Sequence, residues 1–83
     1  MPLSYSDVGD LIAEGLDSSG EKIVSYSWPD FYRINEAATL RESRKDEIKS
    51  YCFEEHQILI AYGDKAIIVC RDRFINRIRV RSS

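Results

Sequence analysis

The spacing of apolar residues near the N-terminus predicts an amphipathic helix over residues 5–17. Its inward face consists of residues three and four apart: Val8, Leu11, Ile12 and Leu16. Ser4 or Ser6 can cap the first turn, because a serine hydroxyl accepts a hydrogen bond from a free backbone N–H there. Gly9 and Gly15 each cost up to about 1 kcal/mol relative to alanine in a helix. We therefore expect this helix to depend on packing.

Alternation of polar with apolar or aromatic residues predicts a strand over residues 22–28. Pro29 cannot donate to a strand ladder, and it favours an extended conformation at the residue before it. We therefore expect a bend or a strand end at this position. The alternation resumes after the bend, which predicts a short edge strand over residues 31–34.

A second helix is predicted over residues 44–55. Its inward stripe consists of Ile48, Tyr51 and Cys52. Ser43 and Asp46 have the spacing of a capping box, which would start the helix at this point. The charged residues of this segment are of mixed sign, and we interpret them as a solvated face.

The C-terminal third is predicted as a three-stranded antiparallel meander. Its first two strands, residues 57–62 and 65–71, are joined by Gly63-Asp64, a dipeptide typical of a two-residue type II′ hairpin loop. Pairing about this loop places Ile60 opposite Ile67. Both faces of the hairpin are apolar, so we expect it to be central in the sheet and covered on both sides.

The third predicted strand, residues 74–80, carries the most uneven charge of the chain. Residues 71–81 hold five arginines and one aspartate, a net charge of +4 against −6 for the rest of a chain with a total charge of −2. Guanidinium groups at every second position stand about 6.5–7 Å apart on one face. The arginines on this face are Arg77, Arg79 and Arg81. Such a row favours an acidic protein surface or the phosphates of a nucleic acid as partner.

The first predicted helix carries acidic residues, whose charge is opposite to that of the arginine row. They recur at steps of three and four along one stripe: Asp7, Asp10, Glu14 and Asp17. One interpretation is a solvated helix face, and a sharper one is a negative surface that docks on a basic groove. A third is pairing with the arginine strand, within one molecule or between copies. Pairing between copies would be heterologous and would give rings or filaments.

Aromatic residues around the predicted bend form a third candidate surface. Trp28, Phe31 and Arg33 are of the kinds that dominate binding hot spots. Exposed rings of this kind also stack on nucleic-acid bases. The alternative is burial of the aromatic residues against the meander.

Catalytic and metal-binding patterns are weak in this chain. Cys52 and His56 lie four residues apart, and the hairpin register places Cys70 opposite Gln57, which raises a zinc hypothesis. No C-x-x-C pair and no fourth ligand accompany them, so we expect core roles for the cysteines and no metal or cofactor. The glycines match no nucleotide-binding fingerprint. We therefore expect a protein that is not an enzyme.

Composition suits a single folded domain, with 43% hydrophobic and 31% charged residues among 83. The apolar runs are far shorter than a membrane span. The first residues lack the basic segment and apolar stretch of a signal peptide. We expect a cytoplasmic protein with reduced thiols and no membrane partner.

Together these patterns predict one α+β domain over residues 1–83, with two helices packed on an antiparallel sheet that includes the C-terminal meander. A small barrel-like closure is the alternative. For function we expect a protein–protein interaction module, an adaptor or an inhibitor, that acts through the acidic helix face and the arginine strand. Its most specific form is an inhibitor of a nucleic-acid-processing complex. The alternative is a small nucleic-acid-binding protein that uses the arginine strand. Assembly of several copies through the opposite charges is a third possibility.

Overall fold

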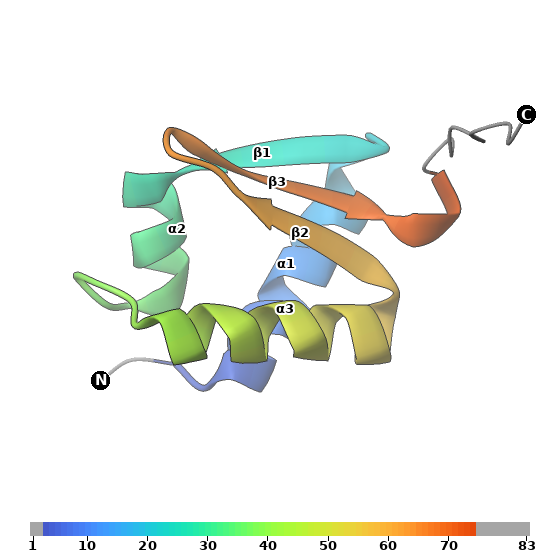
Figure 1. The fold of residues 1–83 in the computed structure, drawn as a ribbon. Coiled ribbons are helices and arrows are strands. Elements are labelled where there is room, and N and C mark those ends of the chain that lie inside the picture. The colour runs from blue at the N-terminus through green and yellow to red at the C-terminus, as the bar shows by residue number, and fades with distance from the viewer. Residues whose placement is uncertain (1–2, 75–83) are drawn as a thin grey trace, which may run out of the picture.

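The computed structural model describes residues 3–74, in which three helices lie on one face of a three-stranded antiparallel sheet (Figure 1). In chain order the elements are α1 Tyr5–Ser19, β1 Ile23–Ser27, α2 Trp28–Asn35, α3 Glu42–His56, β2 Ile58–Tyr62, β3 Ala66–Arg71 and a 3₁₀ turn, η1 Asp72–Phe74. The predicted α+β class is confirmed, with one more helix than expected. None of the described helices combines the length and the apolar character needed to cross a membrane.

Helix α1 is confirmed, but its buried face differs from the predicted one. Ser4 caps the helix, and its hydroxyl accepts a hydrogen bond from the backbone N–H of Asp7 at 3.2 Å. Leu11, predicted to face inward, is 44% exposed. Gly9 and Ala13 are buried instead, because this side of α1 packs against α3. Small residues there let the two helices approach closely.

The segment predicted as a bend and an edge strand over residues 31–34 is helical and forms α2. The hydroxyl of Ser27 caps it by accepting a hydrogen bond from the N–H of Asp30 at 3.3 Å. Pro29 lies in the first turn, where its missing N–H breaks no helical hydrogen bond. The proline therefore starts a helix rather than ending a strand, and the helical spacing brings Phe31 into the core.

Helix α3 begins at Glu42, earlier than predicted, and its N-cap residue Arg41 makes no side-chain cap hydrogen bond. The predicted capping box at Ser43 is therefore wrong, because this serine already lies inside the first turn. The inward stripe is confirmed in its main members, since Ile48 and Cys52 are both fully buried.

The hairpin of β2 and β3 is confirmed, but its pairing is shifted by two residues. Ile60 pairs with Val69 rather than with Ile67. The N–H of Gly63 donates to the carbonyl of Ala66 at 2.9 Å, so the turn starts one residue later than predicted. A shift by two leaves every side chain on its predicted face, because side chains alternate with a period of two. The apolar pattern does not distinguish these two registers.

The third strand of the described sheet is β1, which pairs with β3, so the strand order is β1-β3-β2. The strand predicted over residues 74–80 lies outside the described residues, apart from Phe74 at the end of η1. The described strands form an open sheet rather than a barrel. The helices cover one face only, and Ile68 of β3 is 48% exposed on the other. The expectation of a hairpin covered on both sides is therefore wrong for the described residues.

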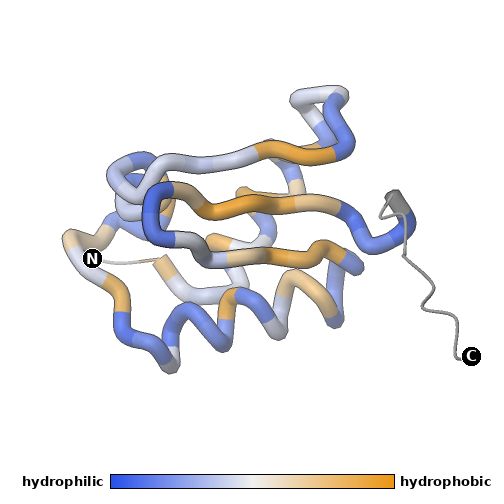
Figure 2. The backbone as a smooth tube through the Cα atoms, turned by 45° about the horizontal axis from the view of Figure 1, so that its top comes forward, coloured by the Kyte–Doolittle hydropathy of each residue, from blue (hydrophilic) through white to orange (hydrophobic). Residues whose placement is uncertain are grey.

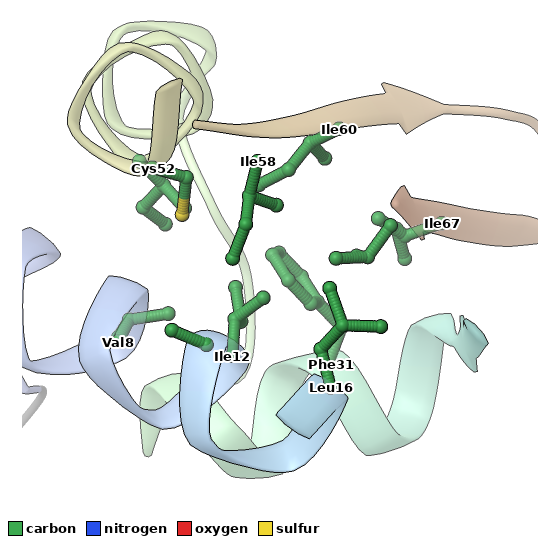
Figure 3. Packing of buried hydrophobic residues seen from close by; sticks show 11 residues of the cluster. Val8, Ile12, Leu16, Phe31, Cys52, Ile58, Ile60 and Ile67 are labelled. Carbon is green, nitrogen blue, oxygen red and sulfur yellow. The ribbon is translucent and has the colours of Figure 1, made fainter. Parts of the chain in front are cut away.

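One core joins the helices to the inner face of the sheet. Hydropathy along the chain is high along β3, in the first half of β2 and at the start of β1 (Figure 2). Side chains of α1 and of the strands point toward one another with Phe31 between them (Figure 3). The core cluster consists of Val8, Ile12, Ala13, Leu16, Phe31, Ile48, Cys52, Ile58, Ile60, Ile67 and Val69. This packing supports α1 in spite of its two interior glycines.

We expect Gly9→Ala to destabilise the protein, although alanine is the better helix former. A Cβ at residue 9 would lie 2.4 Å from Cδ1 of Tyr51, so the ring or the helix would have to move. Overpacking of this kind costs about 1–3 kcal/mol, more than the helix propensity gain of roughly 1 kcal/mol. Urea denaturation measures the free energy of unfolding.

Gly15→Ala is the matched control in the same helix. Its Cβ would meet only the hydroxyl oxygen of Tyr26 at 2.9 Å, the far end of a side chain that can move. We expect its stability to equal or exceed that of the parent protein. Equal loss of stability in both variants would contradict the close approach of α1 and α3 at Gly9.

Candidate functional site

Asp10, one of the four acidic residues of the predicted stripe, is bonded to α3. The Tyr51 hydroxyl donates to Asp10 Oδ1 at 2.7 Å, and His56 Nε2 lies 2.9 Å from the same oxygen. The hydrogen bonds from His56 and Tyr51 lower the pKa of Asp10. Asp10 therefore ties α1 to α3 and is not a free member of an acidic surface.

Asp17, at the other end of the stripe, is ion-paired within the molecule. Arg71 Nη2 lies 2.8 Å from Asp17 Oδ1, and Arg71 Nη1 donates to the backbone carbonyl of His56 at 2.7 Å. One arginine thus connects α1, the end of α3 and β3. Asp7 and Glu14 remain exposed, so only half of the predicted stripe is available to a partner.

The aromatic residues around Pro29 do not form one exposed surface. Phe31 is fully buried in the core and therefore cannot contact a partner. Trp28 is half-buried, its indole N–H donates to the carbonyl of Gly63 at 2.8 Å, and its ring stacks on Tyr62 with centroids 6.0 Å apart. Trp28 thus holds the β2–β3 turn against α2. Arg33 is exposed, 3.7 Å from Asp30.

The arginine row of Arg77, Arg79 and Arg81 lies outside the described residues. Its predicted contact with an acidic protein surface, or with nucleic acid, stays a prediction.

The cysteines and the histidine do not converge. Cys52 is fully buried in the core, and burial raises its thiol pKa to about 11, which keeps the thiol protonated and unreactive. Cys70 pairs with Leu59 instead of lying opposite Gln57. Among the described residues, no three acidic, histidine or cysteine side chains are placed to share a metal ion.

A groove between the start of α1 and the outer side of α3 brings together residues that the sequence left apart. Its volume is about 510 Å³. We call it the acidic groove, and it is lined by Tyr5, Asp46, Glu47, Ser50, Tyr51, Glu54 and Glu55. The rings of Tyr5 and Tyr51 meet edge to face with centroids 5.8 Å apart and form an aromatic wall.

The negative charge of the acidic groove is not neutralised by any ion pair among the described residues. Its four carboxylates, those of Asp46, Glu47, Glu54 and Glu55, are all exposed. The hydrogen bond to Asp10, which lies outside the groove, is the main cause that raises the pKa of Tyr51 to about 12, and burial and the charges of Asp10 and Glu55 add to it. The groove therefore combines an anionic rim with aromatic faces.

The acidic groove is not predictable from the sequence pattern, because its members come from two helices. Glu47 and Glu54 recur seven residues apart, which places them on one side of α3. The same segment also carries lysines and arginines, so it was interpreted as a solvated face of mixed sign. Tyr5 joins the groove only because α1 packs beside α3.

Comparison of the chain with protein-family models, with curated proteins and with solved structures gave no match.

We expect Asp10→Asn to lower the pKa of Tyr51 from about 12 toward its ordinary value of 10.0, because an amide accepts the hydroxyl hydrogen bond without a charge. A raised pKa stabilises the fold below pH 10, and this contribution is lost as the pH rises to about 12. NMR titration of the Tyr51 ring measures the shift. Asp7→Asn, with no bond to Tyr51, should leave the titration unchanged. A Tyr51 that titrates near 10 in the parent protein would contradict the assignment.

Proposed function

We propose that this chain is a non-enzymatic protein–protein interaction module whose acidic groove binds a basic segment of a partner protein. The observation that supports the proposal is the pairing of four exposed, unneutralised carboxylates with two tyrosine rings in one groove. The proposed acidic docking surface is therefore the groove between α1 and α3, whereas the sequence predicted the stripe on α1.

Lysine and arginine side chains suit this groove chemically. Their cationic heads form charge-assisted hydrogen bonds with carboxylates, and a guanidinium group also packs over an aromatic face. Tyr5 and Tyr51 offer such faces beside Glu47 and Glu54. Charge of one sign along a groove also attracts a partner from a distance, which raises the association rate.

A nucleic acid is disfavoured as the occupant of this groove, since its phosphates carry the same charge as the carboxylates. Proteins that bind phosphate backbones present lysines and arginines for that purpose. Occupation of such a surface by the acidic groove would exclude the nucleic acid. The inhibitor of a nucleic-acid-processing complex expected from the sequence is one form of the proposed function.

A short peptide rich in arginine and lysine is the probe, titrated against the ¹⁵N-labelled protein. We expect NMR shift changes at Tyr5, Glu47, Tyr51 and Glu54, and weaker binding at higher salt because the contacts are exposed. The double variant Glu47→Gln and Glu54→Gln should weaken binding by about 1.5- to 5-fold for each carboxylate removed, the effect of exposed ion pairs worth roughly 0.2–1 kcal/mol.

Glu14→Gln is the matched control, since it removes the same charge from an exposed position of α1 that does not line the groove. It should leave the affinity unchanged, and a peptide with glutamine in place of every basic residue should not bind. Equal affinities of the parent protein and the double variant would contradict the proposed function.

A further inference from the structure

The two outer strands of the sheet each have one edge that no described strand pairs with. The N–H of Gly63 donates to Ala66, and the N–H of Asp72 donates to Gln57, so even-numbered residues of β3 bond toward β2. Neighbouring residues of a strand direct their backbone groups to opposite sides. Ile67 and Val69 therefore bond toward β1, where their partners are even-numbered.

It follows that Ile23, Ser25 and Ser27 of β1 direct their backbone N–H and C=O groups away from the sheet. The carbonyl of Ser27, the N-cap residue, accepts the first hydrogen bond of α2, which leaves its N–H available. All three residues are exposed, and Ile23 keeps 59% of its surface in water. This free edge of β1 is open to solvent.

The opposite edge, on β2, differs in accessibility. The same alternation places the free backbone groups of β2 at Ile58, Ile60 and Tyr62. Ile58 is 0% and Ile60 is 4% exposed as whole residues, backbone included. The strand packs on α3, which shields this edge. Of the two edges, β1 is therefore the one that can accept another strand.

The edge of β1 lacks the charged residues, prolines and bulges that usually prevent edge strands from pairing between molecules. Its sequence, Ile-Val-Ser-Tyr-Ser, contains no charged residue and no proline. Its register with β3 runs through five consecutive pairs without a bulge. An open, uncharged, regular edge is a template for strand addition.

We propose that the β1 edge pairs with the β1 edge of a second copy of this chain, antiparallel and about a two-fold axis at Ser25. Ser25 of each molecule then donates one backbone hydrogen bond to Ser25 of the other molecule and accepts one from it. On the helix-facing side, the half-buried Val24 of each copy meets Tyr26 of the other, a β-branched and aromatic pair that stabilises sheets. The interface is self-complementary, as a two-fold dimer requires.

The antiparallel arrangement follows from the register about Ser25. In this register the odd-numbered residues of β1, whose backbone groups point away from β3, exchange hydrogen bonds between the two copies. This dimer differs from the heterologous contact between acidic stripe and arginine strand considered from the sequence, because it closes at two copies.

Sedimentation velocity over a concentration series tests the proposal. The variants carry a charge at residue 25, which lies on the proposed two-fold axis. The parent protein should dimerise, with a dissociation constant on the order of 10–100 µM because the interface is small. Ser25→Lys and Ser25→Glu should each weaken the dimer by at least about tenfold, since like charges then lie directly opposite each other. An equal mixture of the two variants should restore the dimer.

Ile68→Lys is the control, a lysine on the exposed sheet face but on the central strand rather than the edge. This variant should leave the dimer intact. Loss of the dimer in this variant would indicate association through sheet faces and would overturn the proposal. Circular dichroism establishes that each variant folds. In the parent protein, hydrogen exchange at the Ser25 amide should slow as concentration rises.

Several other results would overturn the proposal. They are a parent protein that stays monomeric at every concentration, charge variants that dimerise like the parent, and a mixture that fails to recover the dimer. A dimer that forms without protection of the Ser25 amide would place the contact elsewhere on the molecule.

Discussion

The close packing of α1 on α3 at Gly9 is the contact on which the rest of the arrangement depends. Because this residue has no side chain, the Tyr51 ring lies directly against α1, and its hydroxyl reaches Asp10. The same ring meets Tyr5 and forms the wall of the acidic groove. A glycine that weakens the helix locally is thus required for the tertiary contact and for the candidate site. Its helical cost is offset by burial of the face that contacts the sheet.

Some carboxylates of this protein bond to other side chains of the molecule, and others remain exposed at its surface. Asp10 and Asp17 bond to side chains of α3 and β3, so these carboxylates hold α1 in place. The carboxylates of α3 that line the groove are exposed and form no ion pair among the described residues. The proposed binding of a basic partner would therefore use one part of the surface rather than all of it.

The sheet is equally asymmetric. Helices cover one face, and α3 also shields the β2 edge, but no strand among residues 3–74 pairs with the β1 edge. The acidic groove lies on α1 and α3, whereas β1 occupies the side of the sheet away from β2 (Figure 1). The proposed self-association through β1 and the proposed binding of a basic segment in the groove would therefore use separate surfaces. A dimer of this kind would carry two acidic grooves.

Local periodicity was sufficient to predict α1, β1, the hairpin, most of α3 and the face on which each strand residue lies, because these depend on neighbours in sequence. It was insufficient at Pro29, where the serine cap and the buried Phe31 favour a helix over a strand. Registers that differ by two residues also bury the same side chains, so pairing of Ile60 with Val69 was not predictable from the pattern. The bonds of Asp10 and Asp17, and the ring contact of Tyr5 with Tyr51, join residues more than forty positions apart. Such contacts depend on how the elements pack, which no local pattern encodes.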